Sequence, residues 1–134
     1  MADAVTSTTL LDSDRLAIIQ LTNTSDGNGE SAVTKIDVSA LATRKSDGAT
    51  CTGCKLAKVT YTTFGMSVKL LWDATTDTIC LDLNENYSDQ LDLTEFGGIQ
   101  NTSGSGKTGD INLTTTGHSS GDSYVIVLTV IKTF

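Results

Sequence analysis

The stretch from Lys58 to Asn84 constrains the fold of this chain most, because apolar side chains recur there at every second position. A period of two is typical of β-strands that bury one face. The alternation runs up to Trp72, stops at a polar turn that begins at Asp73, and resumes from Thr78. We therefore predict a hairpin of two strands. The side chains expected in its core are Val68, Leu70, Trp72, Ile79, Leu81 and Leu83.

The rest of the chain repeats this pattern of short alternating segments separated by turn residues. Threonine, serine and glycine are abundant and proline is absent, a composition that favours strands and turns over helices. Further strands are expected at Arg15–Thr22, Ser31–Val38, Val59–Thr63, Met66–Trp72, Gln90–Phe96, Asp110–Thr115 and Tyr124–Phe134. The first two are expected to form a hairpin, and Val59–Trp72 to form one long strand bent at Gly65. The predicted fold class is all-β: an antiparallel β-sandwich of about 7–9 short strands, with a jelly roll or a small β-barrel as the alternative.

A chain of 134 residues fits one domain with one core. We expect residues 15–134 to form a single β-sandwich domain and residues 1–14 to form an extended N-terminal arm, anchored by Leu10 and Leu11. A frayed terminus is the alternative for this arm. Because the chain lacks proline, its sheet edges need protection by charge, by twist or by a partner.

The last expected strand, Tyr124–Phe134, carries apolar side chains on both of its faces. Such a strand is either buried on both faces or lies at an interface. We therefore expect Val125, Val127 and Ile131 to contribute to an interaction surface, together with Leu10 and Leu11 of the arm.

The formal net charge of −7 opposes binding to nucleic acids, because Lys and Arg must replace the counterions that condense on phosphates. It equally opposes binding to anionic membranes. No apolar run approaches the ~20 residues of a membrane span, and the N-terminal stretch has no features of a secretory signal. An acidic surface suits a protein that docks on a basic protein surface.

Three cysteines, Cys51, Cys54 and Cys80, form the most conspicuous candidate for chemistry. A redox role for the Cys51–Cys54 pair requires a helix after it, and a strand-like segment follows instead. A zinc site would need His118 as the fourth ligand, drawn from separated loops. A disulfide, within the chain or between subunits, and free thiols are the remaining interpretations.

Other motifs fail the structural context that their chemistry needs, so we expect no cofactor and no enzymatic activity. Asn101–Thr108 resembles a phosphate-binding loop, but a strand-like segment follows where a helix is required. A calcium loop starting at Asp82 lacks its obligatory glycine, because Tyr87 stands there. The acidic run from Asp73 to Glu95 is then either a solvated face, a loose calcium site at a strand end, or a surface for a basic neighbour.

The central and C-terminal segments resemble small β-rich virion proteins of tailed bacteriophages. The residues that carry this resemblance are Val68-Lys69-Leu70-Leu71-Trp72, Ile79–Leu83, Phe96-Gly97-Gly98-Ile99, Thr108–Thr115 and Gly121–Tyr124 with the final apolar strand through Lys132. The resemblance covers about Val59–Phe134 and is one of strand pattern, without a catalytic signature.

This resemblance implies a capsid decoration (cement) protein, made in the host cytoplasm and located on the outer capsid surface. Such a protein bridges subunits of the major capsid protein, often as a homo-oligomer, with a trimer as the expected form. On this interpretation the cysteines could link subunits or the capsid by disulfides. Alternative interpretations are a neck, tail or fibre-associated module of the virion, and a calcium- or carbohydrate-binding β-sandwich.

Overall fold

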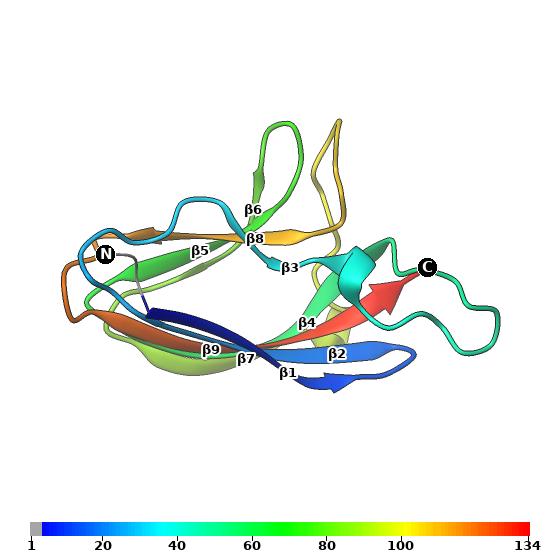
Figure 1. Cartoon of the computed structure of the whole chain (residues 1–134), viewed down its shortest axis with the longest axis horizontal. Helices are drawn as coiled ribbons and strands as arrows, with labels where there is room; N and C mark the ends of the chain where they lie inside the picture. The colour runs from blue at the N-terminus through cyan, green and yellow to red at the C-terminus, as the bar shows by residue number, and fades with distance from the viewer. Residues whose placement is uncertain (1–3) are drawn as a thin grey trace.

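The computed structural model describes residues 4–134, without the side chains of Ala4 and Phe96. Two antiparallel sheets pack face to face in this part of the chain (Figure 1), which confirms the predicted β-sandwich. The strands are β1 (Ala4–Asp12), β2 (Leu16–Thr24), β3 (Val33–Ile36), β4 (Gly53–Phe64), β5 (Ser67–Trp72), β6 (Thr78–Leu83), β7 (Ser88–Asp92), β8 (Ile111–Thr116) and β9 (Ser123–Thr133). One sheet has the order β1-β2-β9-β4-β7 and the other β3-β8-β5-β6. Two short 3₁₀ turns, Val38–Ala40 and Thr94–Phe96, complete the regular structure.

The predicted central hairpin is present as β5 and β6, and it contributes to the core. Of the six side chains predicted there, Val68, Leu70, Trp72 and Leu83 are fully buried and Leu81 is half-buried against them. The prediction for Ile79 was wrong, because 56% of this residue is exposed. The pairing shifts between Leu70–Leu81 and Leu71–Ile79, so that β6 has one extra residue at Cys80. Such a β-bulge reverses the alternation, and it turns Ile79 to the outer side with its partner Leu71.

The hairpin expected between residues 15 and 38 does not form. β2 pairs with β1 on one side and with β9 on the other, so neither of its edges remains for β3. β3 pairs instead with β8 in the opposite sheet. The segment between β2 and β3 is therefore a crossover from one sheet to the other.

Gly65 marks another of the crossovers between the layers. The strand expected to run from Val59 to Trp72 with a bend at Gly65 is two strands, β4 in the five-stranded sheet and β5 in the four-stranded sheet. Gly65 has a φ of +78°, which side chains other than glycine rarely adopt. The predicted bend is thus the corner at which the chain changes sheets.

The described part of the expected N-terminal arm is extended and forms β1, the outermost strand of the five-stranded sheet. It pairs with β2 from Ala4 to Asp12, with a bulge at Leu10. Residues 1–3 lie outside the described part of the chain. The arm is therefore continuous with the sheet.

β9 lies in the centre of the five-stranded sheet, hydrogen-bonded to β2 and β4 along its length. Every second side chain faces the opposite sheet and is buried, namely Tyr124, Ile126, Leu128, Val130 and Lys132. The intervening side chains point to the other face of the sheet, which the rest of the described chain leaves uncovered.

Candidate functional site

The largest candidate interaction surface is the outer face of the five-stranded sheet, which we define by β9 and its direct neighbours. Val125 lies between Thr22 and Thr62, and Val127 lies between Gln20 and Thr60. These side chains alternate with buried core residues, so they point away from the core. The centre of the face thus consists of small β-branched and uncharged polar side chains.

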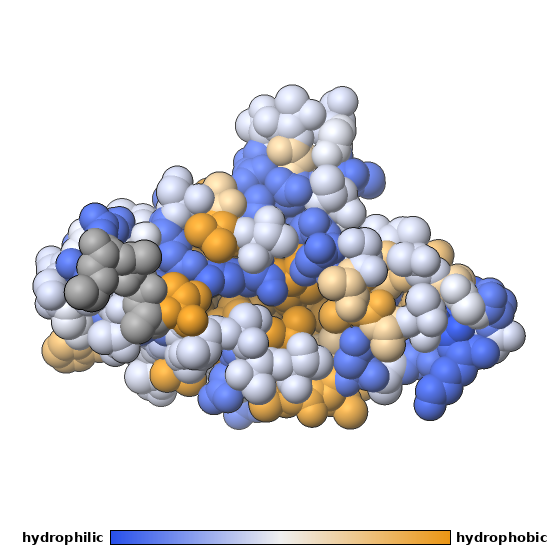
Figure 2. Space-filling view, viewed as in Figure 1, coloured by the Kyte–Doolittle hydropathy of each residue, from blue (hydrophilic) through white to orange (hydrophobic). Residues whose placement is uncertain are grey.

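One end of this outer face is more apolar. Ile131 pairs with Leu16, and Ile18 pairs with Leu11 of β1. Leu16 is 36% exposed and Leu11 44%. In Figure 2, apolar surface gathers along the lower edge of the view, over the sheet that contains β1 and β2. Four strands therefore supply a continuous sheet face with few charges.

The structure brings four of the five predicted interface residues onto this one face. Val125 is exposed, whereas Val127 and Ile131 are half-buried by their neighbours in the sheet. Leu11 extends the face onto β1. Leu10 is the extra residue of the β1 bulge and is 54% exposed at the sheet edge. Phe64 also lies on this face at the end of β4 and is 63% exposed, although the sequence analysis did not single it out.

The charges on this face are sparse and lie towards β4 and β7. Lys58 lies opposite Asp92 in the register of these two strands, and Lys55 lies opposite Ile131. The outer face can therefore pack against another protein without burying many charges, each of which would be costly to desolvate. Packing of this kind is the chemistry that the arrangement supports best.

The three cysteines are free thiols, and no disulfide joins them. Cys51 and Cys54 belong to the core, with exposed fractions of 2% and 4%, and Cys80 packs against that core from the β6 bulge. Of the two interpretations that the sequence left open, a disulfide and free thiols, the structure therefore has the free thiols within the chain. Cys51 donates its thiol hydrogen to the carbonyl of Gly53 over 3.0 Å.

Burial also makes two of these thiols, Cys54 and Cys80, unreactive. It raises the pKa of Cys54 to about 12, with a further contribution from the neighbouring Cys51. Burial alone raises the pKa of Cys80 to about 12. A thiol attacks or binds metal as its thiolate, so neither cysteine is prepared for nucleophilic chemistry near neutral pH.

The loop Asn101–Thr108, which resembles a phosphate-binding loop, is hydrogen-bonded to the turn between β5 and β6. The Ser105 carbonyl accepts a hydrogen bond from the Thr75 backbone N–H over 3.2 Å, and the Thr108 N–H donates to the Asp73 carbonyl. The β5–β6 turn and this loop therefore protrude together from the four-stranded sheet (Figure 1). β8 follows the loop directly, so no helix N-terminus faces it.

The acidic run from Asp73 to Glu95 separates into different environments. The Asn112 amide donates to the carboxylates of Asp73 and Asp77, over 3.0 Å and 3.2 Å. Asp89 and Asp92 lie on the exposed edge strand β7. In residues 4–134, no group of three or more His, Cys, Asp or Glu residues is placed to hold a metal ion.

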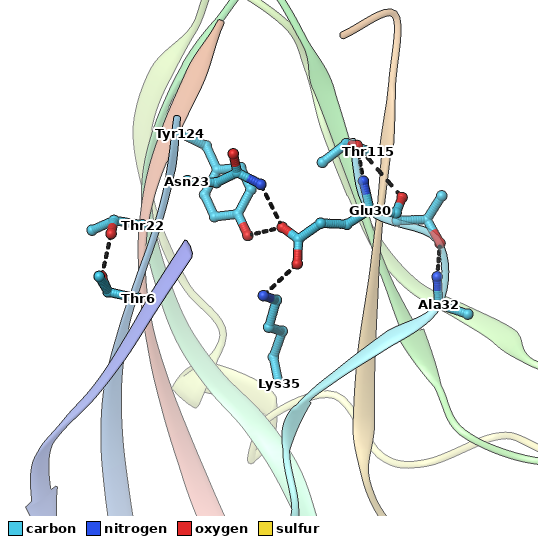
Figure 3. A network of polar contacts seen from close by, with 9 residues as sticks. Thr6, Thr22, Asn23, Glu30, Ala32, Lys35, Thr115 and Tyr124 are labelled. Atoms are coloured by element: carbon cyan, nitrogen blue, oxygen red, sulfur yellow. Dashed lines mark hydrogen bonds and ion pairs between the residues drawn. The ribbon is translucent and has the colours of Figure 1, made fainter. Parts of the chain in front are cut away.

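A buried ion pair joins the two sheets, and the sequence analysis missed it. The Lys35 side chain is 5% exposed, and its Nζ contacts Oε2 of Glu30. The other Glu30 oxygen accepts hydrogen bonds from the Tyr124 hydroxyl, over 2.5 Å, and from the Asn23 amide, over 2.7 Å. Figure 3 shows the Glu30 carboxylate between these side chains.

The backbone of Glu30 completes this connection. Its N–H donates to the Thr115 hydroxyl over 2.8 Å, and its carbonyl accepts from the Thr115 N–H over 3.0 Å. Glu30 therefore binds β8 through its backbone and β2 and β9 through its side chain (Figure 3). The only sequence signal was an acidic residue at the end of a turn and a lysine five positions later, which does not distinguish a buried pair from two solvated charges.

Two basic side chains, Lys132 and Arg44, lie near the C-terminal end of β9. Lys132 points inwards, contacts Asp12 and donates to the Ala42 carbonyl over 3.1 Å. The Arg44 guanidinium lies 4.8 Å from the centre of the Phe134 ring, a cation–π geometry. These contacts hold the loop between β3 and β4 against the end of β9.

No protein-family model and no curated protein sequence matches this chain. In the part of the chain that the structure describes, no helix is long and apolar enough to cross a membrane.

Proposed function

We propose that this chain is a non-enzymatic structural protein of a tailed-bacteriophage virion, which decorates the capsid and stabilises it by bridging subunits of the major capsid protein. The observation that carries the proposal is the outer face of the five-stranded sheet. Its β-branched and apolar residues, among them Leu16, Val125 and Ile131, have no covering layer in the described chain.

Two further observations support a docking role. The resemblance of Val59–Phe134 to small β-rich virion proteins points to a phage particle. The net charge of −7 keeps a free subunit soluble and favours a basic protein surface as the partner. On a capsid, many copies act at once, so a modest contact at each site suffices to stabilise the shell.

The first experiment locates the protein. Virions produced by the strain that carries the gene are labelled with gold-conjugated antibody against the chain and viewed by electron microscopy. Label distributed over the head supports the proposal. Label confined to the neck, tail or fibres contradicts it and indicates the alternative virion module, and unlabelled particles also contradict it.

The second experiment tests the surface. Heads that lack the protein are incubated with purified chain and sedimented, and the bound fraction is measured. We expect Val125→Lys to reduce binding at least tenfold, because the change places a charge in the centre of the docking face. Ile79→Lys is the matched control, since Ile79 is an apolar β-branched residue on the other sheet and is 56% exposed, compared with 42% for Val125. Equal binding of both variants would contradict the assignment of the face.

The trimer is the oligomer that we propose on the basis of the resemblance. Light scattering during size-exclusion chromatography measures it directly, because three copies differ clearly in mass from one or two.

A further inference from the structure

The free edge of β1 differs from the other three sheet edges in length and charge. β1 has nine residues, whereas β7 has five, β3 four and β6 six. β7 carries Asp89 and Asp92, and β6 carries Asp82 and a bulge. Short strands, bulges and charges are the usual protection of sheet edges against pairing with other chains. β1 also has a bulge, at Leu10, and ends at Asp12, but it is the longest edge strand and residues 5–11 carry no charge, so it is the least protected edge by length and charge.

β1 is also accessible at its free edge and on both of its faces. Each residue from Val5 to Leu11 is exposed, although the strand is hydrogen-bonded to β2 along its length. Neighbouring side chains in a strand point to opposite faces, so both faces of β1 are uncovered. A second strand could therefore pair with β1 without displacing any part of the described chain.

The charge distribution indicates which kind of chain supplies this second strand. Residues 5–11 contain no charged side chain, in a chain whose net charge is −7. Two copies of this acidic protein repel each other over most of their surfaces, but they can approach at β1 without bringing like charges together. When two copies meet at this edge, neither presents a charged side chain from residues 5–11 to the other.

The centre of β1 carries the same kind of side chain, a hydroxyl, at each of four successive positions. Apolar Val5 stands at one end, Leu10 and Leu11 stand at the other, and Thr6–Thr9 lies between them. In an antiparallel pair of identical strands centred on Thr8, Ser7 lies opposite Thr9 and hydroxyl side chains occupy the centre. The bulge at Leu10 turns Leu11 to the outer face, whereas Val5 faces the inner side with Asn23. Cross-strand Thr–Thr pairs stabilise sheets, and β1 already makes one, because the hydroxyls of Thr6 and Thr22 are hydrogen-bonded (Figure 3).

We propose that β1 is a self-association edge, at which the β1 strands of two copies pair antiparallel about a two-fold axis near Thr8. The two five-stranded sheets then continue into one another, and the outer faces of both copies lie on the same side. This contact is isologous and involves the edge of the sheet, so it is separate from the docking face and from the three-fold contact of the proposed function.

Single-cysteine variants test this geometry. With the axis near Thr8, the two introduced thiols of a Thr8→Cys variant face each other, within the Cα separation of up to about 7 Å that a disulfide tolerates. In Val5→Cys or Leu11→Cys, the two copies of the new cysteine lie about six residues, or ~20 Å, apart along the strands. After mild oxidation, non-reducing gels should show a dimer for Thr8→Cys and at least tenfold less for the other two variants.

The unmodified chain provides the blank, because Cys51 and Cys54 are buried and Cys80 is half-buried. Circular dichroism confirms that each variant is folded. Absence of a Thr8→Cys dimer above this blank overturns the proposal. Similar dimer yields at all three positions also overturn it, because they indicate parallel pairing or random collision.

A charge placed at the edge provides a second, independent test. Thr8→Lys brings two lysines together at the axis, and we expect the association constant from concentration-dependent light scattering to fall at least tenfold. Gln90→Lys makes the same charge change on the exposed edge strand β7 and should leave the constant within twofold of the parent. A parent that stays monomeric at all concentrations, or equal effects of the two variants, would overturn the proposal.

Discussion

Glu30 shows at the scale of single residues how the two layers are held in register. It is one of very few charged side chains that are almost fully buried, and its carboxylate makes contacts from both sheets. Burial of a charge is costly unless it is paired and hydrogen-bonded. The contacts to Lys35, Asn23 and Tyr124 satisfy this requirement only when both sheets are in their native positions.

We predict that Glu30→Gln lowers the free energy of unfolding by about 3–5 kcal/mol, because it leaves the buried Lys35 cation without its carboxylate. Urea denaturation followed by fluorescence measures this change. Adding Lys35→Met to Glu30→Gln should recover most of the loss, since no charge then remains buried. Asp47→Asn is the control, because the Arg44–Asp47 pair is solvent-exposed and such pairs contribute little. A Glu30→Gln variant as stable as the parent would contradict the prediction.

The buried thiols predict a loss of stability at alkaline pH. The pKa values of Cys54 and Cys80 rise from 9.0 in an exposed thiol to about 12 in the folded chain. The unfolded chain therefore releases these protons first as the pH rises. The stability linked to them is fully present below pH 9.0 and is lost between there and pH 12.

Urea denaturation at a series of pH values measures this dependence. The double variant Cys54→Ala and Cys80→Ala should show a shallower decline above pH 9.0 than the parent. Identical slopes for the two proteins would show that other groups cause the decline.

At the scale of elements, the positions at which strands bend or change sheets determine which side chains reach the core. The bulge at Cys80 moves Ile79 out of the core, although the sequence alternates without interruption. Gly65 sends β5 into the opposite sheet, where Val68, Leu70 and Trp72 can face the buried side chains of β9. Both features are local backbone irregularities with consequences for a whole strand.

We predict that Gly65→Ala destabilises the protein by more than about 1 kcal/mol. A Cβ at this position would lie 2.2 Å from Oδ1 of Asp122, and the φ of +78° is unfavourable for alanine. Gly104→Ala is the matched control, because its Cβ would meet no atom within 4 Å and its φ is not in the left-handed region. Thermal unfolding of the two variants compares them directly, and equal melting temperatures would contradict the assignment of Gly65 as a sheet-crossing corner.

At the scale of the whole molecule, the sandwich encloses its thiols and leaves its surfaces of low charge accessible. All three cysteines lie in or against the core, whereas β1 and the outer face of the five-stranded sheet are accessible. The assembly that we propose through these surfaces therefore rests on packing and strand pairing and requires no oxidation of the cysteines.

We accordingly predict that the mass of the native protein in light scattering is the same with and without reductant. Cys51 and Cys54 cannot reach a partner chain while the core stays intact, because they are 2% and 4% exposed, and Cys80 is half-buried against that core. Ile79→Cys places a thiol on the surface and serves as the control that the assay detects disulfide-linked chains. A parent whose mass falls on addition of reductant would contradict this prediction and restore an inter-subunit disulfide.

The sequence alone determined that this chain forms strands and determined most of the core of its central hairpin. The reason is local: the pleat of a strand has a period of two, so alternating apolar residues such as Val68, Leu70 and Trp72 indicate one buried face regardless of what covers it. The turn after Trp72 and the bend at Gly65 were visible for the same reason, because glycine and short polar side chains tolerate the backbone angles that turns need.

Only the tertiary structure decided which strands are neighbours and which polar groups are buried. β2 pairs with β9, and the paired residues are more than 90 positions apart in the sequence at every point of the register. Because β1 and β9 occupy the two edges of β2, the expected hairpin with β3 cannot form. The contacts of Glu30 and the outward turn of Ile79 depend on the same long-range pairing. Several strands share the same local alternation, so their local sequence does not distinguish one pairing partner from another. The pairing is decided by hydrogen bonds and packing between strands that are distant in the sequence.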